Sequence, residues 1–212
     1  MLNIRPAISS DLESIIRISR ECFPNSPRWQ GPKSLGMIWF KSALAANETE
    51  IWVGLFNEQV VCFAVIIIDE IKWAETKRER RGHLFHWLIS LLANPKPTIS
   101  RIREKWFDRF RDEKGAQVHK KHLNIHSRVW LDMIAVSRHL QGKGLGKQML
   151  SVCEKRTINL HRDGLAFNVE RENVDVLKFY ERCGYTCVAK RKAGCLYVKK
   201  LQDNSLQNSA SV

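Results

Sequence analysis

The stretch LDMIAVSRHLQGKGLG, residues 131–146, carries the strongest structural signal in the chain. Its apolar first half predicts a strand ending at Val136, and the rest predicts a glycine-rich turn that opens a helix. Glycines permit positive φ and close approach of a ligand, and a helix N-terminus adds partial positive charge. The stretch therefore predicts a pyrophosphate site, although a plain glycine-rich turn is the alternative. It has neither the GxGxxG spacing of dinucleotide folds nor the GxxxxGKS/T spacing of P-loops.

A second motif lies downstream in NVDVLKFYERCGY, residues 173–185. Asn173 stands at the start of a predicted helix, and Tyr180 follows seven residues later. Because two helical turns separate them, their side chains share one face of that helix. An amide and a phenol are thus expected on the same side of a helix that follows the glycine-rich turn.

Together the two motifs resemble those of the GNAT superfamily of acyl-CoA N-acetyltransferases. In that family a Gln/Arg-x-x-Gly-x-Gly/Ala turn holds the CoA pyrophosphate, and an Asn-(x)6-Tyr-(x)3-Gly-Tyr/Phe stretch follows it. The matching residues are Gln141, Gly144 and Gly146 for the first pattern, and Asn173, Tyr180, Gly184 and Tyr185 for the second. The resemblance implies an α/β fold with a mixed, mostly antiparallel central sheet of about seven strands flanked by helices. It also implies acetyl-CoA as co-substrate.

The resemblance further implies where acetyl-CoA binds. In this family the fourth strand splays from the fifth and offers backbone groups to the pantetheine arm, with the N–H of Ile134 as the oxyanion donor. Asn173 would bond the same arm, serve as a helix N-cap, or do both. The expected cofactor-binding residues are Ile134, Ala135, Val136, Gln141, Gly142, Lys143, Gly144, Leu145, Gly146, Lys147 and Asn173.

Tyr180 is the expected catalytic acid. The resemblance places its hydroxyl near the thioester sulfur, and a tyrosine with its ordinary pKa near ~10 is protonated at neutral pH. The alternative is a core tyrosine that packs beside Phe179.

The general base stays open at this point. Many relatives use a glutamate on the fifth strand, but the corresponding position here is Asn168, whose amide accepts no proton. The alternatives are Asp132, Glu170, His126 and solvent. Asp132 is favoured as a catalytic residue because it lies on the fourth strand, close to the expected reaction centre.

Length and composition limit the domain organisation. A chain of 212 residues suits one ordinary domain, which we expect at 1–201, followed by a disordered polar tail at 202–212. Hydrophobic residues make up 44% and charged residues 27%, which excludes disordered, collagen-like and coiled-coil compositions. The formal net charge of +13 indicates a polyanionic partner, namely nucleic acid, a membrane surface or a phosphate-rich cofactor.

Cysteine usage and apolar runs predict a cytoplasmic protein. The six cysteines form no CxxC pair and the first residues lack a signal-peptide pattern, so free thiols are expected. The longest apolar run, 84–93, is half the ~20 residues of a membrane span, so no integral membrane association is expected. No metal is expected either, because His119, His122 and His126 share a helical face without a cysteine or carboxylate in register.

The other predicted elements include a helix that begins with a capping box of Ser10 and Glu13. The remaining ones are a strand over 2–6, a helix over 34–46, strands over 50–56, 59–68, 129–136 and 165–169, helices up to 162 and from 173, and a closing hairpin over 186–190 and 196–200.

Residues 69–128 break the family pattern and are treated as a helical insertion between the third and fourth strands. They hold 15 of the 35 basic residues, five of the seven histidines, and Trp73, Trp87 and Trp106. We expect a helical cap over the acceptor side that supplies specificity. A dimerisation surface, which would make the protein a homodimer, is the alternative.

The function expected from these observations is transfer of an acetyl group to a primary amine of a small molecule, such as an amino sugar or a sugar nucleotide. An RNA-associated protein, or an enzyme acting on aminoacyl-RNA or a protein amine, is the alternative, so a nucleic-acid partner is not excluded. A catalytically silent CoA-binding module is a third class, and the presence of Tyr180 argues against it.

Overall fold

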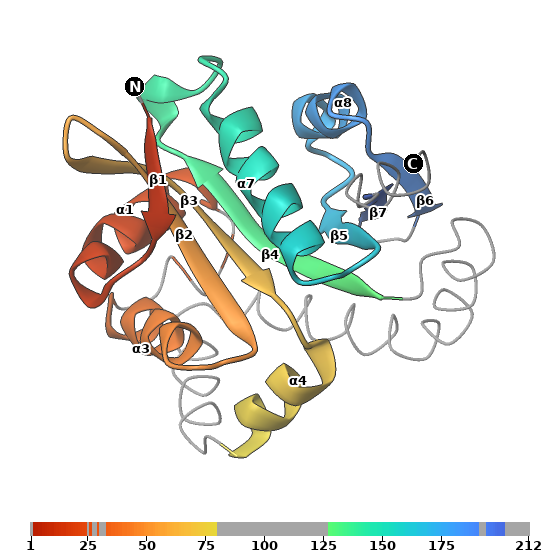
Figure 1. Cartoon of the computed structure of the whole chain (residues 1–212). Helices are drawn as coiled ribbons and strands as arrows, with labels where there is room; N and C mark the ends of the chain where they lie inside the picture. Colours follow the sequence, from red (N-terminus) through yellow and green to blue (C-terminus); the bar gives the residue numbers. More distant parts are fainter. Residues whose placement is uncertain are drawn as a thin grey trace, which may run out of the picture.

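The described residues include seven strands that form one sheet in the order β1-β2-β3-β4-β5-β7-β6 (Figure 1). The structure is a computed structural model, and it describes residues 2–24, 26, 29, 33–79, 127–190 and 194–201. The strands are β1 Asn3–Pro6, β2 Thr49–Phe56, β3 Gln59–Ile67, β4 Arg128–Val136, β5 Gly164–Val169, β6 Thr186–Lys190 and β7 Cys195–Lys200. The helices are α1 Leu12–Cys22, α3 Lys33–Leu44, α4 Glu70–Glu79, α7 Leu145–Asn159 and α8 Val174–Arg182.

Within this sheet β4 and β5 pair in parallel, and the five other neighbouring pairs are antiparallel. This confirms the predicted mixed, mostly antiparallel sheet of seven strands flanked by helices. The turn between β2 and β3 is made by Asn57 and Glu58, both with positive φ, as a two-residue hairpin requires.

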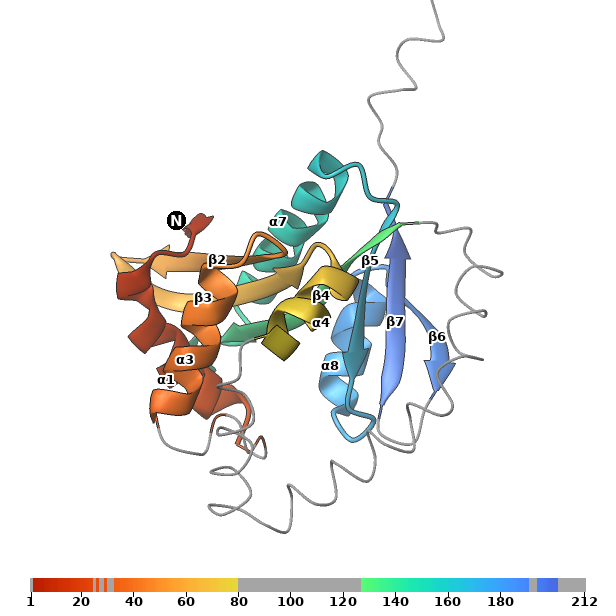
Figure 2. The same ribbon diagram turned by 90° about the horizontal axis from the view of Figure 1, so that it is seen from below.

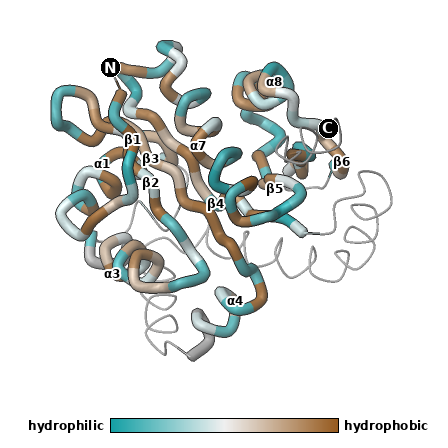
Figure 3. The backbone as a smooth tube through the Cα atoms, in the orientation of Figure 1, coloured by the Kyte–Doolittle hydropathy of each residue, from teal (hydrophilic) through white to brown (hydrophobic). Residues whose placement is uncertain are grey.

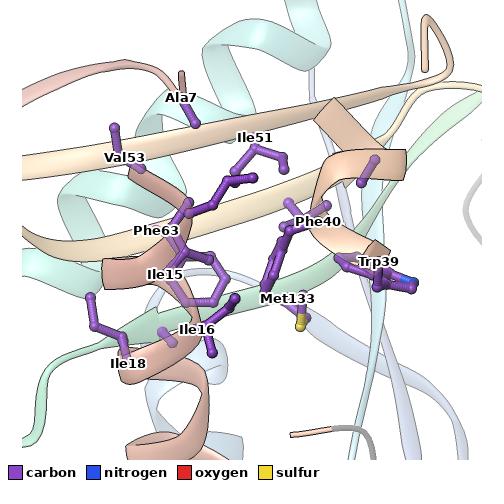
Figure 4. Close-up of a cluster of buried hydrophobic side chains, with 14 of the residues drawn as sticks. Ala7, Ile15, Ile16, Ile18, Trp39, Phe40, Ile51, Val53, Phe63 and Met133 are labelled. Carbon is purple, nitrogen blue, oxygen red and sulfur yellow. The ribbon is translucent and has the colours of Figure 1, made fainter. Parts of the chain in front are cut away.

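Helices cover both faces of the sheet (Figure 2). On one face, α1 and α3 pack against β2 and β3, where Phe40 and Phe63 meet edge to face with ring centroids 5.8 Å apart (Figure 4). On the other face, α7 lies over β3 and β4, and α8 packs beside it against β5. The central strand β3 is buried at every position after Gln59, which explains its nearly continuous apolar sequence (Figure 3).

A carboxylate in the turn before α1 fixes the start of that helix. Asp11 accepts the backbone N–H of Ile8 at 2.8 Å and both terminal guanidinium nitrogens of Arg5 at 2.7 and 2.9 Å. The Arg5 guanidinium holds the pKa of the Asp11 carboxyl below its usual range. The capping box predicted from Ser10 and Glu13 is therefore wrong, because the bond to the preceding backbone comes from Asp11 inside a short 3-10 turn.

The two described ends of the segment between β3 and β4 lie close together. Arg128, at the start of β4, donates its Nε and Nη2 hydrogens to Glu70 Oε2 at 3.1 and 3.0 Å, at the start of α4. Of the insertion expected over 69–128, the structure describes α4 at its start, while residues 80–126 lie outside the described residues. The histidines considered as metal ligands, His119, His122 and His126, lie outside as well. The tail at 202–212 also lies outside.

Two further expectations concern thiols and the membrane. All six cysteines are free, as predicted. Every helix that the structure describes is too short or too polar to cross a membrane.

Candidate active site

The strand β4 separates from β5 after three residue pairs. The parallel ladder joins Arg128 to Gly164 and ends with Trp130 opposite Ala166. Directly beyond this point β4 contains a bulge, because Ile66 of β3 faces Leu131 and Val65 faces Met133, which leaves Asp132 as the extra residue. A bulge bends its strand and increases the local twist. The bulge therefore gives a physical reason for the divergence of β4 and β5 (Figure 1).

The second half of β4 presents backbone groups to this divergence. Ser137 donates its N–H to the carbonyl of Val61 at 2.8 Å, and Ala135 lies opposite Phe63 in the same ladder. Since the hydrogen-bonding direction alternates along an antiparallel strand, the N–H groups of Ile134 and Val136 point away from β3. No residue of β5 pairs with them among the described strands.

A glycine turn follows β4 and leads into α7. Gly142 and Gly144 have φ of 77° and 78°, where side chains other than glycine are strained. A Cβ placed on either glycine would have open space around it, so a ligand can approach the backbone there. The first turn of α7 contains no acidic residue. Its free N–H groups thus offer partial positive charge without competition from a carboxylate.

Basic side chains surround this turn. Arg138, His139, Lys143 and Lys147 are all exposed on or beside it. An anion at the N-terminus of α7 would therefore meet backbone donors and cationic side chains together.

The end of β4 is braced by two side chains. Gln141 donates its Nε2 hydrogen to the carbonyl of Val136 at 2.9 Å, which folds the turn back on the strand. Cys22, at the end of α1, donates its thiol to the same carbonyl at 3.2 Å. Burial raises the pKa of the Cys22 thiol, which keeps it protonated as a donor. Sequence reasoning missed Cys22 because 114 residues separate it from Val136 and it belongs to no motif.

Ser137 is a second residue that sequence reasoning missed. It is buried at the point where β4 enters the turn, and its Oγ has no hydrogen-bond partner among the described residues. A buried hydroxyl without a partner is costly, so a ligand that bonds it would relieve that cost.

Tyr180 lies on α8 and projects into an aromatic cluster. Its ring centroid is 4.1 Å from that of Phe167 on β5 and 5.1 Å from that of Phe179. Phe179 also reaches α7, because a Cβ on Gly146 would lie 3.6 Å from its Cζ. The ring of Tyr180 is thus fixed between the strand that leaves β4 and the helix that begins at the glycine turn.

The hydroxyl of Tyr180 differs from those of the two other tyrosines. Tyr185 donates its hydroxyl hydrogen to Glu154 and Tyr197 donates its own to Glu181, each at 2.9 Å. In the described part of the chain the Tyr180 hydroxyl has no such partner. Burial raises its pKa above the ordinary tyrosine value, so it stays protonated at neutral pH. The ring of Tyr180 is therefore part of the core, while its hydroxyl remains available to donate a hydrogen bond to a ligand.

Asn173 occupies the N-cap position of α8, as its sequence position predicts. Its carbonyl accepts the N–H of Leu177 at 3.0 Å, but its side chain is exposed and makes no capping hydrogen bond. The amide is thus available to a ligand, and its predicted use as a side-chain cap is wrong.

The candidates for the general base fall in different places. Asp132 is the bulge residue, partly exposed, two positions before Ile134. Glu170 is exposed directly after β5, and Asn168 is an exposed β5 residue whose neighbours Phe167 and Val169 are buried. His126 lies outside the described residues. Of the two carboxylates, Asp132 lies closer along the backbone to the unpaired N–H groups.

These residues fit coenzyme A. An open glycine turn, helix N–H groups and basic side chains suit its phosphates, and the unpaired N–H groups of Ile134 and Val136 suit the carbonyls of its amide arm. The orphaned hydroxyl of Ser137 lies beside that path.

The sequence of this region matches a known family. Residues 109–185 match the model described as the Acetyltransferase (GNAT) family, and this range includes β4, the glycine turn, α7, β5 and α8. This part of the chain is therefore similar to the GNAT family. The predicted resemblance is thereby confirmed over residues 109–185, which include the splayed pair β4 and β5.

Two curated relatives match a shorter region of the chain. It is 33% identical over 63 residues to a probable spermine N(1)-acetyltransferase of Bacillus subtilis subsp. natto (strain BEST195). It is 32% identical over 63 residues to a spermine/spermidine N(1)-acetyltransferase of Bacillus subtilis (strain 168). In each case the match covers 29% of this chain and 41% of the relative, so the chain spans about two-fifths of the relatives' length.

Solved acetyltransferase structures have a similar fold over nearly the whole chain. A putative GNAT acetyltransferase from Desulfovibrio desulfuricans superposes with a TM-score of 0.61 at 12% identity, covering 95% of this chain and 100% of that one. The PaiA N-acetyltransferase of Thermoplasma acidophilum, solved with coenzyme A, gives 0.55 at 12% identity, covering 94% and 99%. The ribosomal-protein-S18-alanine N-acetyltransferase of Escherichia coli gives 0.57 at 11%, covering 97% of each.

The glycine turn makes the first testable prediction. Calorimetric titration with coenzyme A should show binding to the wild-type chain, and Gly144→Glu should weaken it by more than about tenfold, because a carboxylate would oppose the phosphates at the helix N-terminus. Gly144→Ala carries the same positive-φ strain without the charge and should lose much less affinity. Equal affinity of the glutamate variant and the wild type would contradict the site.

Proposed function

We propose that the chain is an acetyl-CoA-dependent N-acetyltransferase that acts on a primary amine. The observation that carries the proposal is the strand β4, whose unpaired N–H groups lead into an open glycine turn while Tyr180 holds an uncommitted hydroxyl on the adjacent helix. This combination suits an acyl donor that is a long phosphorylated chain ending in a thioester.

Acetyl-CoA supplies a thioester carbonyl that an amine can attack. Ile134 is assigned as the N–H donor to the carbonyl oxygen, where negative charge develops. Tyr180 is assigned as the donor to the sulfur as the C–S bond breaks and the new C–N bond forms. Asp132 is assigned as the group that accepts the amine proton, directly or through water. One proton passes from nitrogen to Asp132 and one from Tyr180 to sulfur. Transfer of a proton from Asp132 to Tyr180 through solvent restores both residues and closes the proton balance.

We further propose that the acceptor is a small amine bearing negative charge or none, such as a sugar nucleotide with a free amine or an amino sugar. The formal net charge of +13 attracts anions and repels polycations at long range. A polyamine, the substrate named for the two Bacillus proteins, carries several positive charges and would approach this chain against that field. An amine on RNA would share the attraction, and it enters as the alternative.

The acceptor class can be tested by thiol release from acetyl-CoA with a matched set of amines. We expect the highest kcat/KM for an anionic amine, such as a nucleoside-diphosphate amino sugar. Its kcat/KM should fall as salt rises, because screening shortens the reach of the positive field. Faster turnover of spermine would contradict the acceptor class alone, and faster turnover of aminoacyl-tRNA would favour the alternative. Absence of thiol release with every amine would contradict acetyl transfer itself.

The role of Tyr180 predicts a split between turnover and binding. Tyr180→Phe should lower kcat by about 100-fold, since a positioned proton donor contributes on this order, and leave KM for acetyl-CoA nearly unchanged because the ring packing remains. Tyr197→Phe is the matched control, because its ring belongs to the same cluster with its centroid 6.3 Å from that of Tyr180 and its hydroxyl is bound to Glu181. Similar kcat values for Tyr180→Phe and the wild type would leave Tyr180 with a purely structural role.

A further inference from the structure

Lys199 joins three separate elements through one ammonium group. It lies on β7, and its Nζ donates to Glu154 Oε1 of α7 at 3.0 Å and to the carbonyl of Cys183, directly after α8, at 3.0 Å. The same Nζ lies 5.4 Å from the centroid of the Tyr185 ring. An ammonium has three hydrogens to donate, and two of them are used here, one on α7 and one on the residue that follows α8.

Glu154 accepts a second bond that closes the network. The Tyr185 hydroxyl donates to Glu154 Oε1 at 2.9 Å, so one carboxylate oxygen receives both the tyrosine and the lysine. The two charged side chains are 29% and 19% exposed, which places the ion pair partly out of water. Because charge-assisted bonds in such places are strong and directional, the network fixes how α7 and the end of α8 lie relative to each other.

The end of α8 is in turn tied to Tyr180. The backbone carbonyl of Tyr180 accepts the N–H of Tyr185 at 3.0 Å and that of Cys183 at 3.0 Å, across a turn in which Gly184 has a φ of 84°. The network thus includes Cys183 and Tyr185, which follow the last turn of α8, the turn that contains Tyr180. The helix α7, which contains Glu154, begins at the glycine turn proposed to hold the phosphates. A shift at Lys199 would change the distance between these two parts of the site.

We propose that Lys199 and Glu154 are positioning residues, which hold the Tyr180 hydroxyl at the place where the thioester sulfur must lie when the phosphates occupy the glycine turn. They touch neither substrate nor reacting atoms and act through Tyr180. The inference rests on the proposed acetyl transfer and deepens it.

Lys199→Met tests this role, because it keeps the apolar stem and removes the ammonium. Turnover, kcat, should fall by about tenfold, since small displacements of a catalytic group cost on this order or more, while KM for acetyl-CoA should stay within about twofold. Lys199→Arg restores a cation that can reach both partners and should recover most of the lost kcat. Glu154→Gln keeps an acceptor without the charge, and its kcat should fall between those of Lys199→Met and the wild type.

A double-mutant cycle with Tyr180→Phe separates positioning from a general structural role. If Lys199 acts through the Tyr180 hydroxyl, Lys199→Met should change kcat by less than about twofold in the Tyr180→Phe background, because the group it positions is gone. Equal losses of kcat in both backgrounds would overturn the proposal. So would an unchanged kcat with only a lower thermal midpoint. If Lys199→Met does not fold, the same cycle with Glu154→Gln replaces it, and the same two outcomes overturn the proposal.

The wild-type assay distinguishes this failure from failure of the proposed function. Wild-type thiol release together with an uncoupled cycle overturns the positioning role alone. No thiol release from the wild-type chain with any amine overturns acetyl transfer and the positioning role with it.

Discussion

The site depends on one constraint, which is that every backbone N–H in a sheet needs a partner. Along most of β4 this need is met by β3 on one side, and by β5 on the other for three residue pairs. Beyond Trp130 the bulge at Asp132 turns the strand away, and the N–H groups of Ile134 and Val136 are left facing outward. A ligand with a row of amide carbonyls satisfies these groups as a further strand would. The chain thereby creates a binding edge in the middle of its sheet instead of at its border.

The elements around this edge fix its position and give its two ends different chemical character. The glycine turn and the first turn of α7 supply donors at one end, and the aromatic cluster around Phe167 holds Tyr180 across the gap. Gln141 and Cys22 both bond the carbonyl of Val136, so the strand end cannot swing freely. The proposed sites of phosphate recognition and proton donation thus lie on α7 and α8, which are joined by packing and by the hydrogen bonds around Lys199.

The sequence predicted the parts of the fold that depend on local chemistry. Positive φ at Gly142 and Gly144 and the helix start at Leu145 follow from the glycine spacing itself, and the hairpin over 49–67 follows from two apolar runs around Asn57-Glu58. The capping box failed because the carboxylate of Asp11, bound by Arg5, bonds the N–H of Ile8 instead. That competition needs a residue six positions away and leaves no mark in the local pattern.

The parts of the site that the sequence did not predict join residues far apart in the chain. The bond of Cys22 to Val136 and the ion pair of Lys199 with Glu154 cross 114 and 45 positions, and neither residue type is unusual in its own segment. The sequence did not predict the bulge at Asp132 for a different reason. Burial still alternates at every second residue of β4 across the bulge, although Val129 and Leu131 belong to the core on the α7 face and Met133 and Ala135 to the core on the α1 face. The hydrophobic pattern therefore shows no break at the bulge.

The central claim is that the outward N–H groups of β4 receive the cofactor arm, and residue-resolved amide hydrogen exchange tests it most directly. Without ligand, the amide of Ala135 should already be protected by β3, while those of Ile134 and Val136 should exchange much faster. Saturating coenzyme A should slow exchange at Ile134 and Val136 strongly and change Ala135 little. Exchange at Ile134 and Val136 that is slow in the free protein, or unchanged while coenzyme A is bound, would contradict the account.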